Sequence, residues 1–200
     1  MKDTVQVSLC GFGGQGILLI GGLLGAAAIR EGYWAAGANS YGAQARGSGC
    51  RAEVVIAREP ADYPHVVAAD LLVAMAQDAY TLYLPGLAPT GLVIVDHPDV
   101  VPLAGDGRLH LPVEATATAV ERFGNRQAAN VVMLAATVAI TGLVGRAALA
   151  EAVSKGVDAR FREANRNALE AGFEMGERVQ AEAGESLSPW LSRLGLGRED

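Results

Sequence analysis

A glycine-rich turn near the start of the chain, from Gly11 to Gly16 (GFGGQG), constrains the fold more than any other feature. It follows an alternating segment rich in β-branched residues at 5–10 and leads into an uninterrupted apolar stretch at 17–29. The first pattern is typical of a strand and the second of a buried helix. A strand, a glycine turn and a helix in this order open a Rossmann-like α/β domain. Because glycine has no side chain, such a turn brings bare backbone close to another group.

The rest of the chain predicts strands alternating with helices, followed by helices alone. Short apolar runs bounded by turn residues predict further strands at 33–39, 51–58, 71–75, 92–96 and, as a short extended piece, 108–111. Helical patterns follow at 15–31, 78–84, 112–123 with Pro112 in the first turn, 128–142, 146–155 and 158–183. This order predicts the α/β class: a Rossmann-like three-layer domain with a mostly parallel sheet and C-terminal helices. We expect a single domain over 1–183 and a C-terminal tail over 184–200, with Trp190 ordered on a partner.

Charge and composition argue against several classes of function. The net charge is −6, which disfavours a nucleic-acid partner. The apolar stretches 17–29 and 128–144 are too short or too interrupted for membrane insertion. The amino terminus has no signal-peptide pattern, so we expect a cytoplasmic protein. Cys10 and Cys50 lie far apart and form no C-x-x-C pair, which argues against a zinc or iron–sulfur site in this chain.

The glycine turn allows three interpretations. Gly11, Gly13 and Gly16 form a G-x-G-x-x-G pattern between a strand and a helix, as in dinucleotide-binding sites. Such sites also need an acid at the end of the second strand, and 38–40 (ANS) has none, which disfavours NAD or FAD. The helix amino terminus still offers N–H groups to another phosphate. The third interpretation is tight packing, which three glycines on the predicted helix also indicate: Gly21, Gly22 and Gly25.

A second unusual loop, from Ser40 to Cys50, joins the second and third predicted strands. It is denser in Gly, Ser and Gln than a plain connection needs. Arg46 within it and Arg51 after it can each grip a phosphate or a carboxylate, because the guanidinium fork matches both. They can equally pair with a local acid such as Glu53 or with a neighbouring subunit. The residues alone leave these alternatives open.

The remaining polar residues predict little chemistry. Gly105-Asp106-Gly107 followed by Asn130 superficially matches a pattern that holds a metal and a diphosphate, but the extended segment after it predicts a surface turn. His97 follows a strand at the end where ligands often bind, yet no nucleophile lies near it in sequence. The other histidines and both cysteines are expected to be structural: His65, His110, Cys10 and Cys50.

Five segments, read in order, carry a family resemblance. They are VSLCGFGGQG at 7–16, SYGAQARG at 40–47, DLLVAM at 70–75, GLVIVD at 91–96 and NVVML at 130–134. Together they resemble the gamma subunit of 2-oxoacid:acceptor oxidoreductases, over nearly the whole chain from Val5 to Val179. Enzymes of this kind oxidise a 2-oxoacid with coenzyme A (CoA) to an acyl-CoA and CO₂ and pass the electrons to ferredoxin or a similar acceptor.

The resemblance implies a subunit that does not perform the chemistry alone. Thiamine diphosphate and its Mg²⁺ would lie between the alpha and beta subunits. The iron–sulfur clusters would lie in the beta and delta-type subunits. The gamma subunit would pack on this core and help to cover the CoA site, although its glycine turn could also touch only a sister subunit.

The residues and the resemblance together select one set of candidate cofactor-binding positions and no catalytic or metal-binding residue. The set is Gly11, Gly13, Gly14, Gln15, Gly16, Ser40, Tyr41, Gly42, Arg46, Gly47 and Asn130. Two other functions stay open: a free-standing Rossmann nucleotide-binding oxidoreductase, and a purely structural assembly subunit. The identity of the 2-oxoacid and of the electron acceptor is not predicted.

Overall fold

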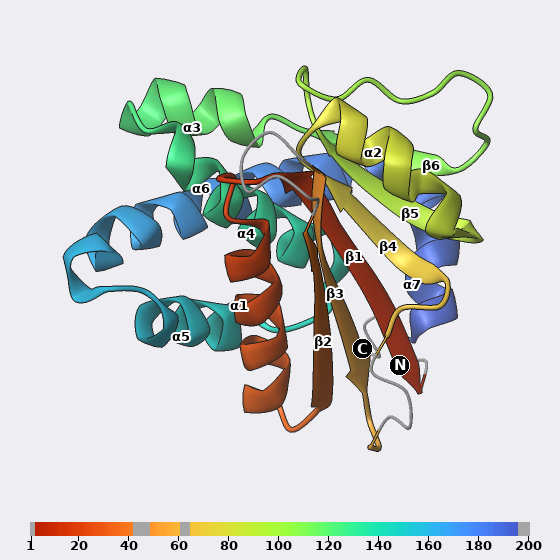
Figure 1. Cartoon of the computed structure of the whole chain (residues 1–200), viewed down its shortest axis with the longest axis horizontal. Coiled ribbons are helices and arrows are strands. Elements are labelled where there is room, and N and C mark those ends of the chain that lie inside the picture. Colours follow the sequence, from red (N-terminus) through yellow and green to blue (C-terminus); the bar gives the residue numbers. More distant parts are fainter. Residues whose placement is uncertain (1–2, 42–48, 61–64, 196–200) are drawn as a thin grey trace.

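Within the described residues the strands form one sheet, in which a reversed strand separates the first two (Figure 1). The computed structural model describes residues 3–41, 49–60 and 65–195. The strands are β1 (Thr4–Phe12), β2 (Trp34–Tyr41), β3 (Gly49–Ala57), β4 (Ala69–Ala74), β5 (Leu87–Asp96) and β6 (Leu109–Val113). Their spatial order is β2-β3-β1-β4-β5-β6. β3 runs antiparallel to both of its neighbours, whereas the β1–β4, β4–β5 and β5–β6 pairs are parallel. The predicted mostly parallel sheet is confirmed, with β3 as the exception.

Helices cover both faces of the sheet and make the domain three-layered, as predicted (Figure 1). One face carries α1 (Ile17–Arg30), α4 (Ala129–Thr141), α5 (Arg146–Gly156) and α6 (Arg162–Ala183). The other face carries α2 (Gln77–Tyr83). α3 (Ala115–Phe123) follows β6, and α7 (Ser188–Leu194) follows α6. Short 3₁₀ turns lie at Leu84–Gly86, Arg126–Ala128, Ala159–Phe161 and Gly184–Ser186.

The apolar stretch at 128–144 forms the central helix α4, which is buried along almost its whole length. Helix α6 packs closely on it because Gly172 and Gly176 lie directly against the carbonyl oxygens of Val132 and Ala136. A helix that is apolar on all sides is stable only when protein surrounds it, and α4 meets that condition. In the described part of the chain, no helix is both long and apolar enough to cross a membrane.

Two expected features differ in the structure. Pro112 lies inside β6 and does not start a helix; α3 begins at Ala115. β6 is an edge strand, where the missing N–H of proline is tolerated. The segment expected as a tail is helical from 184 to 194, and Trp190 is buried. Its indole N–H donates to the carbonyl of Asp70 at 3.1 Å, so Trp190 is ordered by this chain and not by a partner.

Candidate functional site

The glycine turn lies at the carboxyl end of β1, where the strand connections diverge. α1 follows β1 on one face of the sheet, and α2 follows β4 on the other. Ligands of open α/β sheets bind at such a switch point. The N–H of Gln15 donates to the carbonyl of Phe12 at 3.1 Å and closes a tight turn through Gly13 and Gly14. Gly14 has a φ of 102°, a conformation that favours glycine.

Two of the glycines are also required by packing within the chain. A side-chain carbon at Gly11 would lie 2.5 Å from Oε1 of Gln15. One at Gly16, whose φ is 77°, would overlap the amide nitrogen of Asn130. Asn130 lies in the first turn of α4 and is 8% exposed. The structure thus brings the turn and Asn130 together, and packing explains Gly11 and Gly16, whereas Gly14 is exposed with nothing near its missing side chain.

Gln15 ties together the ends of the two strands that border the switch point. Its Oε1 accepts from the backbone N–H of Phe12 at 2.6 Å, and its Nε2 donates to the carbonyl of Met75 at 2.9 Å. Phe12 ends β1, and Met75 directly follows β4. The side chain therefore occupies part of the crevice that a dinucleotide would enter in a Rossmann fold, and it makes the turn rigid.

Two small cavities flank Gln15. The smaller, of about 120 Å³, is lined by Gly14, Gln15, Met75, Thr116, Arg126, Gln127 and Ala129. The larger, of about 280 Å³, is lined by Phe12, Gln15, Met75, Ala76, Gln77, Asp78, Asp99 and Arg126. Gln15, Met75 and Arg126 border both, so the two cavities form one concave edge beside the glycine turn, which we call the turn edge.

The turn edge contains one arginine, Arg126, and two acids, Asp78 and Asp99. The starts of α1, α3 and α4 border the smaller cavity through Gln15, Thr116 and Ala129. Helix starts present N–H groups and a partial positive charge. At the start of α3 the N–H of Thr116 already donates to Asp96, and at the start of α4 the N–H of Ala129 donates to the carbonyl of Arg126. The start of α1 has no side-chain cap.

Arg126 adds a full positive charge and is held by Asp99, whose carboxylate lies 2.6 Å from its guanidinium. No sequence pattern marks Arg126, because the 3₁₀ turn before α4 brings it to the glycine turn from more than a hundred residues away.

A buried carboxylate fixes one of these helix starts. The N–H and the hydroxyl of Thr116 donate to Asp96 at 3.0 and 2.6 Å. Asp96 ends β5 and is fully buried, and this burial raises the pKa of its carboxyl. The pair anchors α3 to the carboxyl end of the sheet, so the position of Thr116 in the turn edge is well defined.

The structure describes only part of the second loop, from Ser40 to Cys50. Gly42, Arg46 and Gly47 lie outside the described residues. Ser40 and Tyr41 end β2, and β3 lies between β2 and β1. Two strand spacings, roughly 10 Å, therefore separate them from the glycine turn. Of the alternatives for Arg51, the local pair is present: its guanidinium lies 2.7 Å from Glu53 and stacks over Tyr83.

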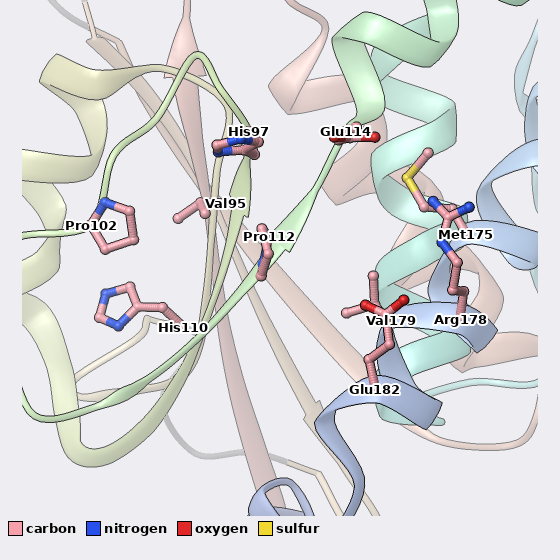
Figure 2. A pocket seen from close by; sticks show the side chains of 10 residues that line it. All are labelled: Val95, His97, Pro102, His110, Pro112, Glu114, Met175, Arg178, Val179 and Glu182. Carbon is pink, nitrogen blue, oxygen red and sulfur yellow. The ribbon is translucent and has the colours of Figure 1, made fainter.

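Two of the histidines, His97 and His110, line a groove of about 480 Å³ between β6 and α6 (Figure 2). His65 lies elsewhere, 3.6 Å from the carboxylate of Glu53. His110 is structural, as expected: its ring nitrogens lie 2.9 Å from the hydroxyl of Tyr80 and 3.0 Å from the carbonyl of Arg108. His97 is exposed at the rim, and none of the residues that line the groove is a Ser, Thr or Cys. The Asp106 carboxylate binds Arg108, which matches the expected turn and not a metal site.

The cysteines are buried, as expected, and burial raises the pKa of both thiols. Among the described residues, no three or more His, Cys, Asp and Glu side chains converge as a metal site would require.

Comparison with known proteins decides between the functions left open. The chain matches the family model described as pyruvate ferredoxin/flavodoxin oxidoreductase over residues 6–175. This chain belongs to that family. Within the family it is the gamma subunit of a 2-oxoacid oxidoreductase complex, which confirms the resemblance. The same findings do not support a free-standing nucleotide-binding oxidoreductase.

Three relatives illustrate the similarity. The 2-oxoglutarate synthase subunit KorC of Methanothermobacter marburgensis is 39% identical over 178 residues, which are 85% of this chain and 95% of that one. The keto/oxoacid ferredoxin oxidoreductase gamma subunit of Geobacter sulfurreducens is 33% identical with a TM-score of 0.80, covering 88% and 98%. The 2-oxoglutarate:ferredoxin oxidoreductase of Magnetococcus marinus, solved with 2-oxoglutarate, CoA and succinyl-CoA bound, shares the fold at 22% identity and a TM-score of 0.80. This match covers 91% of the present chain but 32% of that longer one.

Proposed function

We propose that the turn edge of this gamma subunit contributes to the binding of CoA in the assembled complex. The observation that carries the proposal is that Arg126 and the uncapped start of α1 border one cavity beside the glycine turn. CoA carries several phosphates, and helix starts and guanidinium groups are common phosphate ligands. The bound CoA in the Magnetococcus marinus enzyme, whose chain contains the same fold, supports the choice of ligand.

The residues of the turn edge divide into two roles. Arg126 and the exposed backbone around Gly14 would hold a phosphate directly. Gln15 and Asn130 would keep the turn in place, through the Phe12 and Met75 hydrogen bonds and through the contact with Gly16. When bound, CoA supplies the thiol that receives the acyl group. In this proposal the described residues of the turn edge bind and orient CoA.

The chemistry itself is proposed to lie in sister subunits of alpha, beta and delta type. They would carry the thiamine diphosphate, the Mg²⁺ and the iron–sulfur clusters. The support is the family membership. The purified complex, and not this chain alone, is therefore the object in which the function is tested.

A charge-removing variant tests the CoA proposal. In the assembled complex, Arg126→Ala is expected to raise the KM for CoA by about three- to thirtyfold, the size of one lost charge-assisted contact. Its KM for the 2-oxoacid should stay unchanged. Arg122→Ala is the matched control, because Arg122 pairs with Glu174 on the exposed surface of α3 and α6. An unchanged KM for CoA in Arg126→Ala would leave the turn edge only its packing and assembly role.

We also propose 2-oxoglutarate as the substrate of the complex, because two relatives that are 39% identical, and that this chain covers to 94–95% of their length, are 2-oxoglutarate synthase subunits. The test is to co-purify the chain with its sister subunits and compare the reduction of a viologen dye by 2-oxoglutarate, pyruvate and 3-methyl-2-oxobutanoate. A kcat/KM at least tenfold higher for 2-oxoglutarate is expected. A higher value for either of the other acids would contradict this assignment.

A further inference from the structure

The larger cavity of the turn edge, of about 280 Å³, differs in chemistry from the smaller one. Two carboxylates line it, those of Asp78 and Asp99. Asp99 is bound to Arg126, whereas Asp78 is exposed and has no hydrogen-bond or ion-pair partner among the described residues. A free carboxylate repels a phosphate and accepts hydrogen bonds. The larger cavity therefore favours an uncharged part of a ligand, one that carries a hydrogen-bond donor.

Gln77 lines the same cavity with an amide that is bonded at one end only. Its Oε1 accepts from the backbone N–H of Val101 at 2.7 Å. This bond fixes the orientation of the amide, because only its oxygen can accept. The Nε2 group is then left with two N–H donors and no acceptor within the part of the chain that the structure describes. Gln15 differs, since both ends of its amide are bonded inside the chain.

Apolar side chains complete the lining of the larger cavity: Phe12, Met75 and Ala76. Phe12 is half-buried and packs against the core under α2. The lining thus offers a donor and an acceptor beside an aromatic residue. A flat ring that carries an acceptor next to an amino group matches it, and adenine is such a ring. Glutamine amides pair with this edge of adenine, and aromatic side chains stack on its face.

We propose that the larger cavity binds the adenine ring of CoA, with Gln77 donating to a ring nitrogen and Asp78 accepting from the amino group. The inference rests on the proposed function of the turn edge. Arg126 borders both cavities, so a phosphate that it holds lies next to the larger one. The thiol at the other end of CoA has to reach the reacting groups, which we place in sister subunits. The adenine end is the one that remains for this chain.

The contact with the base is a modest one. A neutral hydrogen bond contributes a factor of about three to ten in affinity. Gln77 and Asp78 alone would therefore not hold an adenine nucleotide on the isolated chain. They act in the assembled complex, together with the phosphate contact of Arg126.

The test compares CoA with 1,N⁶-etheno-CoA, which keeps the phosphates and the thiol but has lost the hydrogens of the amino group. In the assembled wild type, the KM for etheno-CoA should be about three- to tenfold above that for CoA. Asp78→Ala should bring the two KM values together, because neither ligand then has the amino-group contact. Equal KM values in the wild type, or unchanged discrimination in Asp78→Ala, would overturn the inference.

Gln77→Glu separates ligand binding from folding. Glutamate keeps an oxygen that accepts from Val101 and loses the Nε2 donor. The Tm should therefore stay unchanged, while the KM for CoA rises about three- to tenfold. Leu82→Glu adds the same charge on the same helix, at a side chain that is 62% exposed and lines neither cavity, and is the control. A wild-type KM for CoA in Gln77→Glu would contradict the role of Gln77.

Arg126→Ala distinguishes a failure of this inference from a failure of the CoA site as a whole. If Arg126 binds a phosphate, its removal raises the KM of both ligands alike. Such a rise without discrimination in the wild type would overturn the adenine assignment and leave the proposed function intact. Discrimination that depends on Asp78, without any effect of Arg126→Ala, would retain the base contact and refute the phosphate contact.

Discussion

Two independent constraints require a glycine at position 16 of the turn. Its φ of 77° is a conformation that residues with side chains rarely adopt. The amide of Asn130 also fills the space in which a side chain would sit. The same residue caps the start of α1 without any side-chain hydrogen bond, so its backbone alone sets the direction of the helix.

Gly16→Ala is therefore expected to destabilise the chain by about 1–3 kcal/mol, through strain at positive φ and displacement of Asn130. Urea unfolding measures the change. Gly22→Ala is the matched control on the same helix; it has open space around it and should raise the stability by about 0.5–1 kcal/mol. Equal stabilities for the two variants would contradict this account of the turn.

Asp106 gives the chain an acid-sensitive contact. The Nε of Arg108 donates to both carboxylate oxygens of Asp106, at 2.9 and 2.8 Å, and the pair holds the pKa of Asp106 below its usual value. The folded-state pKa is lower than the unfolded one, so the contact stabilises the fold above about pH 4 and is lost as the pH falls through the lowered pKa.

Between about pH 5 and pH 3, Asp106→Asn should consequently lose less free energy of unfolding than the wild type. The measurement is the free energy of unfolding in urea at a series of pH values. Glu170→Gln, an exposed acid in the middle of α6, serves as the comparison and should leave the slope as it is. If the stability of Asp106→Asn fell with pH as steeply as that of the wild type, other carboxylates would be responsible for the loss of stability in acid.

At the scale of elements, α7 closes the amino end of the sheet. Trp190 and Leu194 are buried in the main core. Arg193 donates to the carbonyl of Thr90 at 3.0 Å and lies 3.4 Å from the carboxylate of Asp70. Asp70 itself is 1% exposed and also accepts from the backbone of Gln6. One short helix thus connects three strands: β1, β4 and β5.

Trp190→Ala is expected to cost about 3–5 kcal/mol, because it opens a cavity and removes the hydrogen bond to Asp70. Thermal and urea unfolding report the loss. Ser192→Ala, on the exposed side of the same helix, should change the stability by less than about 0.5 kcal/mol. If Trp190→Ala were equally mild, α7 would be an appendage and not part of the core.

At the scale of the whole molecule, the insertion of β3 between β1 and β2 decides against a dinucleotide. In a Rossmann site the second strand ends beside the glycine turn and supplies the acid that binds the ribose. Here β2 ends two strands away, at Ser40 and Tyr41, and carries no acid. Gln15 fills part of the crevice that remains.

Adding NAD or FAD to the isolated chain should therefore leave its Tm unchanged. A ligand at a hundred times its Kd would stabilise a protein by about 2.7 kcal/mol, which is several degrees in Tm. Differential scanning fluorimetry resolves such a shift. An upward shift with either cofactor would contradict the strand-order argument.

The local pattern of the sequence was sufficient for some features and not for others. The strand, turn and helix from Thr4 to Arg30 were predictable because apolar periodicity and glycine placement are local signals. The position of β3 was not, because a pattern shows that a strand is buried but not which strands lie beside it. Arg126 reaches the turn edge, and Trp190 reaches Asp70, only through the packing of distant helices.

The start of β1 and the end of α7 both lie at the edge of the sheet opposite the glycine turn. β1 begins, and α7 ends, at the amino edge of the sheet, whereas the turn lies at the opposite edge (Figure 1). In the Magnetococcus marinus enzyme the same fold is 32% of a longer polypeptide. A covalent linker at either end of this domain departs from the far side. A longer chain that contains this fold can therefore continue from either end without covering the turn edge.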